Sequence, residues 1–320
     1  MKRLAFIGEC MIELRDTGGA GGTGGTGSGG AMHRTFGGDT LNSAVYAARC
    51  LQSEDAAVEY VTILGDDPFS SEMLTAWRTE GVGTALVTRQ TGALPGLYAI
   101  RTDATGERSF HYWRSESPAR ELLADANAAA LSASLAEFDL LYVSGITLAI
   151  LRAAGRDRLF ETLARARARG AIIAFDSNYR PRLWPDEDTA RRVITRGAAA
   201  ATLILSSFDD ERALFGDTSP EESARRLHAL GAQEIVIKNG AGTCLVSLRG
   251  NGKDGAESGE WRVAPPTIAR PVDTTAAGDS FNAAYLAARL MGAAAEAAAV
   301  RGAALAAQVI QHPGAIVNVP

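Results

Sequence analysis

The feature that most constrains the fold is an alternation of short apolar runs with longer amphipathic segments along most of the chain. Apolar runs bounded by Gly, Asp or Asn predict buried strands at residues 4–7, 58–64, 140–144, 171–175, 202–205, 234–237 and 244–248. Helical periodicity predicts helices at residues 40–52, 68–79, 151–169, 188–200, 220–230, 279–291 and 293–310. Nearly continuous apolar strands that alternate with helices are typical of an α/β fold, with a mostly parallel sheet covered on both faces.

The length of 320 residues exceeds that of most domains. Because α/β folds of this size commonly form one domain, we expect residues 1–320 to form a single unit. Parallel sheets bind their ligands beyond the carboxyl ends of the strands. The residues that follow each predicted strand are therefore the first candidates for a functional site.

One region breaks the alternation. Residues 94–101 and 108–114 predict the two strands of a β-hairpin, with Gly106 in the turn. Its alternating pattern and its aromatic side chains Tyr98, Tyr112 and Trp113, which we expect to be exposed, favour a strand pair lying over a site. With residues from about 10–36, segment 94–114 is expected to form a small β lid. The aromatic strand pair is also a candidate interface for a homo-oligomer.

The glycine-rich run 18–30, GGAGGTGGTGSGG, is the second break. It matches GxGxxG trivially, but it holds no Lys and no apolar helix start follows it. We therefore expect a flexible, low-complexity insertion in the lid and no phosphate site. The chain has no GxxxxGK[ST] pattern, which excludes a P-loop NTPase.

Composition excludes several classes of protein. A net charge of −5 without a basic stripe argues against nucleic acid as a partner. The three cysteines, Cys10, Cys50 and Cys244, have no CxxC spacing, which fits a reducing cytoplasm and neither a disulfide framework nor a zinc site. The four histidines also lack metal-ligand spacing. No signal peptide or membrane span is evident, so we expect a cytoplasmic protein.

The run 272–281, VDTTAAGDSF, carries the most specific chemical signal. It places the small residues Ala276, Ala277 and Gly278 where an Ala-rich helix begins. Unpaired N–H groups at a helix start bind anions, and only small side chains let a phosphate approach them closely. Asp279 within such a site is electrostatically unfavourable unless it takes a proton from an attacking hydroxyl. A helix cap is the commoner role of a lone Asp, but this spacing favours a phosphoryl-transfer site.

Gly37 and Gly38 precede Asp39 and Asn42 at another predicted helix start. These groups could surround a polyol, although an ordinary loop-to-helix junction contains the same residue types.

Two further segments follow predicted strands. Asn178 and Arg180 lie directly after a buried strand, and the planar fork of an arginine suits a carboxylate or a phosphate. The tight turn 238–243 contains Lys238, and its glycines could let a nucleotide lie against the backbone. A hairpin needs such glycines in any case.

Taken in this order, these elements resemble the ribokinase-like carbohydrate kinases. That family has a GG-containing signature near the N-terminus, here at Gly37 and Gly38 with Asn42, and a D-T-x-[GA]-A-G-D signature, here at 273–279. Within the family the chain looks most like the kinases of 2-dehydro-3-deoxygluconate. That closer resemblance rests on GECMIEL (8–14), FGGDTLN (36–42), LPGLY (94–98), TGERSFHYWR (105–114), NYRPRLW (178–184) and DTTAAGDSF (273–281). The run 18–30 departs from the family pattern.

The resemblance implies a ribokinase-like three-layer α/β/α fold with a small β lid. It implies ATP-dependent phosphorylation, with Mg²⁺, of the 6-hydroxyl of 2-dehydro-3-deoxy-D-gluconate. Asp279 would be the base and residues 276–278 the anion hole. The sugar acid would be bound by Gly37, Gly38, Asp39, Asn42, Tyr98, Tyr112, Arg114 and Arg180. ATP would be bound by Asn178, Lys238, Gly240, Gly242 and Thr243.

The two arginines, Arg114 and Arg180, would meet the substrate carboxylate, because a neutral sugar gives no reason to aim two guanidinium groups at the cleft. Asp210 would lie near Mg²⁺, although Ser207 and Asp210 replace the Asn and Glu of the family's N-x-x-E element. Asp273 corresponds to a monovalent-cation ligand, which implies K⁺. Glu13 is expected to point toward the sugar.

Three other functions remain open. A kinase of a neutral sugar, such as fructose, ribose or a ribonucleoside, differs in its acceptor. A non-catalytic sugar or nucleotide sensor would retain the fold without turnover. A hydride-transferring Rossmann enzyme needs a glycine fingerprint after its first strand, where this chain has Gly8, Glu9, Cys10 and Met11.

Overall fold

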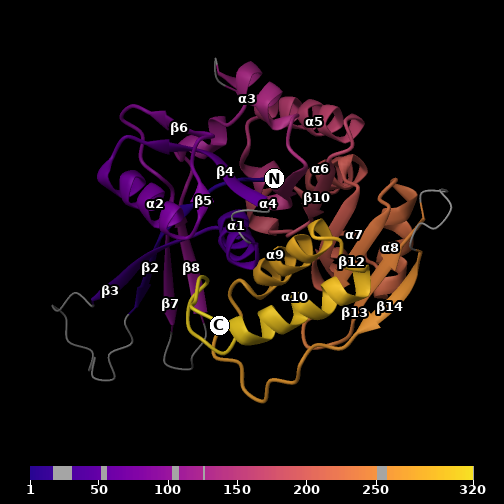
Figure 1. The fold of residues 1–320 in the computed structure, drawn as a ribbon. Coiled ribbons are helices and arrows are strands. Elements are labelled where there is room, and N and C mark those ends of the chain that lie inside the picture. Colours follow the sequence, from indigo (N-terminus) through magenta and orange to yellow (C-terminus); the bar gives the residue numbers. More distant parts are fainter. Residues whose placement is uncertain (17–30, 52–55, 103–107, 125–126, 251–257, 320) are drawn as a thin grey trace.

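A ten-stranded sheet runs through the middle of the protein in a computed structural model that describes residues 1–16, 31–51, 56–102, 108–124, 127–250 and 258–319 (Figure 1). Its strands, from one edge to the other, are β14 (Gly259–Val263), β13 (Cys244–Leu248), β12 (Glu234–Lys238), β11 (Leu203–Ser207), β10 (Ile172–Asp176), β9 (Leu140–Ser144), β1 (Lys2–Ile7), β4 (Ala56–Gly65) and β5 (Val82–Gly83), while β6 (Val87–Gln90) also pairs with β4. Pairs from β12 to β5 are parallel, and β13 and β14 are antiparallel at one edge.

Helices cover both faces of this sheet, so the predicted three-layer fold is confirmed. One face carries α1 (Asp39–Cys50), α2 (Pro68–Thr79), α9 (Ala277–Leu290) and α10 (Ala295–Val309). The other carries α3 (Ala128–Leu135), α4 (Gly145–Ile150), α5 (Ala153–Ala168), α6 (Glu187–Ala200), α7 (Phe208–Phe215) and α8 (Pro220–Ala229). The short 3₁₀ helices are η1 (Pro118–Glu121) and η2 (Pro181–Leu183).

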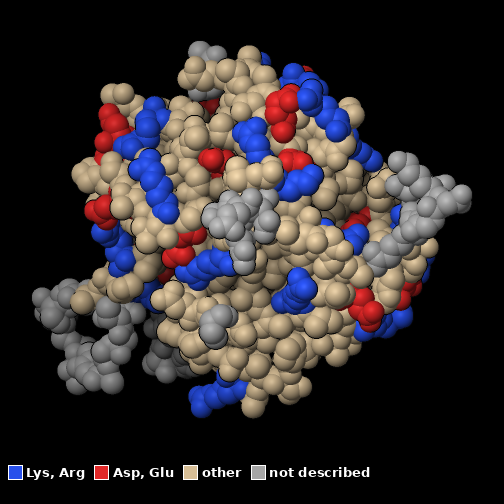
Figure 2. Space-filling view, viewed as in Figure 1, with Lys and Arg blue, Asp and Glu red and all other residues tan. Residues whose placement is uncertain are grey.

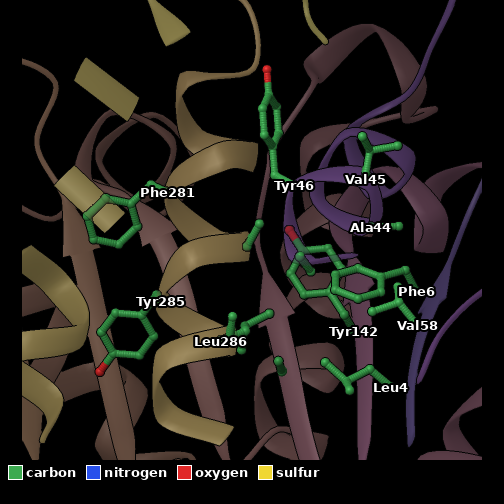
Figure 3. Packing of buried hydrophobic residues seen from close by; sticks show 14 of the residues in the cluster. Leu4, Phe6, Ala44, Val45, Tyr46, Val58, Tyr142, Phe281, Tyr285 and Leu286 are labelled. Atoms are coloured by element: carbon green, nitrogen blue, oxygen red, sulfur yellow. The ribbon is translucent and has the colours of Figure 1, made fainter. Parts of the chain in front are cut away.

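The strands are apolar on both sides because each face packs against helices. In β1, Leu4 and Phe6 belong to the cluster under α1 and α9, whereas Ala5 and Ile7 belong to the cluster on the opposite face. Figure 3 shows the first cluster, in which side chains of α1 and α9, such as Val45 and Leu286, lie beside those of the strands. This packing fixes the starts of α1 and α9 near the carboxyl ends of the parallel strands.

Every strand and helix predicted outside the lid exists, with ends that differ by a residue or two. The prediction missed the strands β5, β6 and β14 and the helices α3, α4 and α7. These elements are short: β5 has 2 residues and α4 has 6. Such segments give too few repeats for a period to be recognised.

A separate four-stranded sheet forms the lid, at the lower left of Figure 1. Its order is β3 (Met32–Gly37), β2 (Met11–Asp16), β7 (Leu97–Thr102) and β8 (Arg108–Trp113), and only the β2–β7 pair is parallel. The predicted hairpin therefore forms as β7 and β8. The predicted insertion 18–30 and the predicted turn residue Gly106 lie outside the described residues.

The prediction that Tyr98 is exposed is wrong. Tyr98 is 8% exposed, because its ring packs against Met11 and Ile100 and stacks on Tyr112. Tyr112 and Trp113 are exposed as predicted, at 49% and 61%.

Charges of both signs are interspersed on the face seen in Figure 2, without a single-sign stripe. Among the described residues, no helix has both the length and the apolarity needed to cross a bilayer.

Candidate active site

A cleft of about 2210 Å³ lies where the carboxyl ends of the parallel strands meet the lid sheet. The strand ends contribute Glu9 after β1, Asp176 of β10, Ser207 of β11 and Lys238 of β12. The lid and the start of α9 form the other walls. Most of the predicted site residues line this cleft, and the main exceptions are Gly37, Thr243 and Asp273.

The anion-binding wall is the first turn of α9. Ala276, which precedes the helix, has φ 60° and ψ 13°, a left-handed conformation that is uncommon for any residue but Gly. This turn brings the first residues of the helix to the cleft, which residues 276–279 all line. In the described part of the chain, the N–H groups of Gly278 and Asp279 donate to no backbone carbonyl or side chain. A Cβ on Gly278 would lie 3.5 Å from Nζ of Lys238, so a small residue here keeps the space beside that ammonium open.

Asp279 follows directly, and its carboxylate lines the cleft. Its Oδ2 accepts a hydrogen bond of 2.8 Å from Nδ2 of Asn42, in the first turn of α1. Burial and the negative charge of Asp39 raise the pKa of Asp279 to about 7, and Asp176 adds to the rise, while Asn42 and Lys238 oppose it. A carboxyl with a pKa near neutrality is suited to accept a proton from an alcohol.

The start of α1 forms the adjacent wall. A Cβ on Gly38 would lie 2.2 Å from the carbonyl oxygen of Glu9, so this position requires glycine, whereas a Cβ on Gly37 would lie 2.5 Å from the hydroxyl of Tyr98 and would displace that side chain. The glycines let α1 begin against the end of β1. Asp39, in the first turn, accepts a 2.8 Å hydrogen bond from Nδ2 of Asn178. Gly38, Asp39 and Asn178 line the cleft, and Gly37 lies behind it against Tyr98.

Lys238, the last residue of β12, lines the cleft beside Gly278. Its ammonium donates to Oδ2 of Asp176 and to Oδ1 of Asn282, both at 2.9 Å. Asn282 in turn donates to the same Asp176 oxygen at 2.6 Å and to the hydroxyl of Tyr142 at 2.9 Å. This network holds Lys238 beside the first turn of α9.

The lid wall is built from β2, β7 and β8. The buried hydroxyl of Tyr98 donates to Oε2 of Glu13, and its ring stacks on Tyr112 with centroids 5.7 Å apart. Glu13 is 3% exposed and does not line the cleft, so the expectation that it points toward the sugar is wrong. Its carboxylate holds the hydroxyl of Tyr98, which does line the cleft.

Arg114 has a partner within the protein, which the sequence did not indicate. Its guanidinium pairs with Oε2 of Glu9, whose side chain is 2% exposed. The other oxygen of Glu9 and Nε of Arg114 are buried without a hydrogen-bond partner among the described residues. Both residues line the cleft. This ion pair therefore still has hydrogen-bonding capacity for a ligand.

Arg180 contacts different residues from those that Arg114 contacts. Its guanidinium donates to the carbonyl oxygen of Tyr179 at 2.8 Å and lies 3.5 Å from Oδ1 of Asp210. Burial raises the pKa of Asp210 to about 6; Arg180 opposes the rise and Asp176 adds to it. Asp210 is thus a carboxylate that a cation would stabilise. No cluster of three or more His, Cys, Asp or Glu side chains able to hold a metal ion occurs in the described residues.

The glycine turn after β12 lines the other end of the cleft through Lys238, Gly240 and Gly242. Gly240 has φ 54°, which favours glycine. Thr243 was predicted to bind ATP, but it is exposed and does not line the cleft.

Asp273 was predicted to bind a monovalent cation, but it lies outside the cleft and is 4% exposed. Its carboxylate accepts hydrogen bonds from Arg15, at 3.1 Å, and from the backbone N–H groups of Thr275 and Gly314, at 2.9 and 3.0 Å. A guanidinium therefore stands beside this carboxylate.

Sequence reasoning missed three residues of the site: Glu9, Asp176 and Asn282. Glu9 and Asp176 each stand at the end of a predicted strand, the same signal that drew attention to Asn178. Asn282 is one helical turn beyond Asp279 and shares its side of α9.

Comparisons with known proteins agree with this geometry. A model of the pfkB family of carbohydrate kinases matches residues 1–320. A curated relative, the 2-dehydro-3-deoxygluconokinase of Dickeya dadantii (strain 3937), is 46% identical over 320 residues, which cover 99% of this chain and 97% of the relative. The solved PfkB protein from Polaromonas sp. JS666 has a TM-score of 0.81 at 27% identity, covering 97% of this chain and 96% of its own. A ribokinase II candidate from E. coli, solved in complex with ATP and Mg²⁺, shares the fold with a TM-score of 0.80 at 18% identity, covering 98% of this chain and 94% of its own.

Proposed function

This chain belongs to the pfkB family of carbohydrate kinases, and on that basis we propose that it phosphorylates 2-dehydro-3-deoxy-D-gluconate with ATP. The product is 2-dehydro-3-deoxy-6-phospho-D-gluconate. One observation carries the proposal: Asp279 lines the cleft beside the amides of the first turn of α9, in a chain 46% identical to a 2-dehydro-3-deoxygluconokinase.

Asp279 is the general base. It takes the proton of the 6-hydroxyl as the hydroxyl oxygen forms a bond to the γ-phosphorus, and the bond from that phosphorus to the β–γ bridging oxygen breaks to release ADP. With a pKa of about 7, a large fraction of Asp279 is ionised at neutral pH. The ionised carboxylate is also a stronger base than one with an ordinary pKa, so it can accept the proton. The hydrogen bond from Asn42 holds the carboxylate in place.

The transferring phosphoryl group sits on residues 276–278. The amides of the first turn of α9 and the ammonium of Lys238 stabilise its negative charge. Since Lys238 is held by Asp176 and Asn282, it is oriented before ATP binds. The rest of the nucleotide lies along Asn178, Gly240 and Gly242, which line the cleft.

Mg²⁺ supplies charge neutralisation for the phosphates. The donor set fits it, since Mg²⁺ is usually bound through one or two carboxylates together with phosphates and water. Asp210 is the carboxylate we assign to it, because it lines the cleft and because a bound Mg²⁺ would offset the burial and the charge of Asp176 that raise its pKa in spite of Arg180.

The sugar acid binds at the lid end of the cleft. Gly38, Asp39 and Asn42 face its hydroxyls, Gly37 lets Tyr98 approach, and Tyr112 closes over the ring. Arg114 meets the carboxylate of the substrate, and Arg180, which also lines the cleft, adds positive charge. Because Glu9 already pairs with Arg114, the substrate carboxylate must share that guanidinium with Glu9.

The decisive test is an ADP-release assay over a panel of 2-dehydro-3-deoxy-D-gluconate, its galactonate epimer, fructose and ribose. We expect turnover with the sugar acid and little with the neutral sugars. A higher kcat/KM for fructose or ribose would make the protein a neutral-sugar kinase. Binding of ATP without turnover on any acceptor would make it a sensor.

Two further expectations accompany the assignment. ATP as co-substrate and three free cysteines fit a cytoplasmic enzyme. We also propose that the exposed Trp113 of β8 packs against a second copy of the chain, so light scattering should show a dimer for wild type and a smaller species for Trp113→Ser.

A further inference from the structure

A group of three charged side chains joins the lid sheet to the loop before α9. Arg15, on β2, donates from Nη1 to Oδ2 of Asp273 at 3.1 Å and from Nη2 to Oε1 of Glu13 at 3.0 Å. The side chains of Glu13 and Asp273 are each only 4% exposed, and that of Arg15 is 22% exposed. Two buried carboxylates therefore share one guanidinium, whose planar fork can serve both at once.

The carboxylate of Asp273 has little capacity left for a metal ion. Oδ1 accepts the N–H of Thr275, and Oδ2 accepts both Arg15 and the N–H of Gly314. A carboxylate offers about four lone-pair sites, and at least three are occupied here. A monovalent cation at this carboxylate would also lie beside the guanidinium of Arg15 and be repelled by it. The residues present do not fit the cation predicted at Asp273.

On one side, this carboxylate fixes the loop that leads to α9. The N–H groups of Val272 and Asp273 donate to the carbonyl oxygen of Ile310, at 2.8 and 3.2 Å, and Thr275 is bound to the Asp273 side chain. The next residue, Ala276, has the left-handed conformation from which α9 begins at the wall of the cleft. Restraining Asp273 thus restrains the turn that forms the anion-binding wall.

On the other side, the same guanidinium reaches the wall of the sugar site. Glu13 accepts from Arg15 with one oxygen and from the hydroxyl of Tyr98 with the other. Tyr98 stacks on Tyr112, and both line the cleft. A continuous set of contacts therefore runs from the sugar side of the lid to the phosphate side of the cleft.

We propose that Arg15 is a positioning residue that supplies the positive charge at Asp273 from within the chain, so that the enzyme needs no monovalent cation there. The same contact couples the lid to the anion-binding wall. This inference rests on the proposed function for its kinetic readout, but its ATP-binding readout does not depend on the identity of the sugar.

The test compares wild type, Arg15→Ala and Arg15→Lys in potassium chloride and in N-methyl-D-glucamine chloride of equal ionic strength. ATP affinity is measured by calorimetry without sugar, and kcat and KM by ADP release. Arg169→Ala is the matched control, because Arg169 forms an exposed ion pair with Glu137 far from the cleft. Thermal unfolding of each variant establishes that it is folded.

We expect wild type and Arg169→Ala to bind ATP equally well in both salts. Arg15→Ala should lose about tenfold in ATP affinity in the potassium-free salt and regain part of it in potassium, because the vacated carboxylates can then attract the ion. Arg15→Lys should lose less, since it keeps the charge but cannot bridge both carboxylates.

Stimulation of wild type by potassium would overturn the proposal, and so would unchanged ATP affinity of Arg15→Ala in the potassium-free salt. The comparison of salts on wild type decides the matter even if Arg15→Ala does not fold. A wrong sugar would instead appear as missing turnover with normal ATP binding.

Discussion

Nδ2 of Asn42 lies 2.8 Å from Oδ2 of Asp279, across a separation of 237 residues in sequence. This hydrogen bond joins the first turn of α1 to the first turn of α9. It occupies one carboxylate oxygen, and in the described part of the chain Oδ1 has no hydrogen-bond partner. The two signature segments of the chain therefore meet at the atom pair that orients the proposed base.

Replacing Asp279 with Asn should abolish most turnover while leaving ATP binding intact. The amide keeps the size of the side chain and can still accept from Asn42, but it cannot take a proton. We expect kcat to fall by about 10²–10⁴-fold, the usual contribution of a general base. Steady-state kinetics and ATP calorimetry on the same preparation measure both effects. A variant that kept more than about a tenth of wild-type kcat would remove Asp279 from the role of base.

The pH dependence of turnover should report the ionisation of Asp279. Because the base acts when deprotonated, kcat/KM should rise with pH through the pKa of about 7. The hydrogen bond from Asn42 lowers that pKa, so Asn42→Ala should move the rising limb to higher pH. An unchanged or acid-shifted limb in Asn42→Ala would contradict this account.

The same raised pKa predicts that ionised Asp279 lowers the stability of the folded protein at neutral and alkaline pH. A carboxyl whose pKa is higher in the folded than in the unfolded state favours folding when protonated, so its ionisation costs stability as pH rises from about 4 to 7. Asp279→Asn should therefore unfold at a higher temperature than wild type at pH 8, by about 2–4 °C. The difference should shrink toward pH 5. Calorimetry measures the difference in unfolding temperature between Asp279→Asn and wild type from pH 5 to pH 8. A difference that stays constant over this range would rule out the titration of Asp279 as its cause.

Arg114→Ala should weaken binding of the sugar acid steeply, by about 2–5 kcal/mol, and spare residual activity on neutral sugars. Part of any loss will come from Glu9, which the truncation leaves buried and unpaired. A double-mutant cycle with Glu9→Gln separates the two contributions. If Glu9→Gln with Arg114→Ala binds the acid as well as wild type, Arg114 does not recognise the carboxylate.

Asp210→Asn should raise the Mg²⁺ concentration needed for half-maximal turnover by about tenfold or more, because the neutral amide is a poorer ligand. Asp157 is a matched control, since its side chain is 61% exposed, pairs with Arg196 on the surface and does not line the cleft. Asp157→Asn should leave the Mg²⁺ requirement unchanged. Equal requirements in both variants would move the metal away from Asp210.

The sequence predicted most of the sheet and the helices because their signals are local. The apolar runs of β1 and β9 and the Pro at the first turn of α2 lie within the elements they specify. The anion-binding wall is also local, since its small residues and Asp279 occupy consecutive positions. Even there, the left-handed φ of Ala276 was not predictable, because that conformation is typical of Gly.

The sequence by itself determined the features that periodicity and neighbouring residues encode. These are an α/β sheet with both faces covered, a small lid, and an acidic residue at an amide-lined helix start. The tertiary structure alone decided which polar groups pair across the cleft. Arg114 could have faced substrate freely, but folding places the buried Glu9 against it. Asp273 could have bound an ion, but folding brings Arg15 from the lid to its carboxylate. Such pairs join residues more than 100 positions apart, and they form only where packing leaves a charge buried beside a group that can neutralise it.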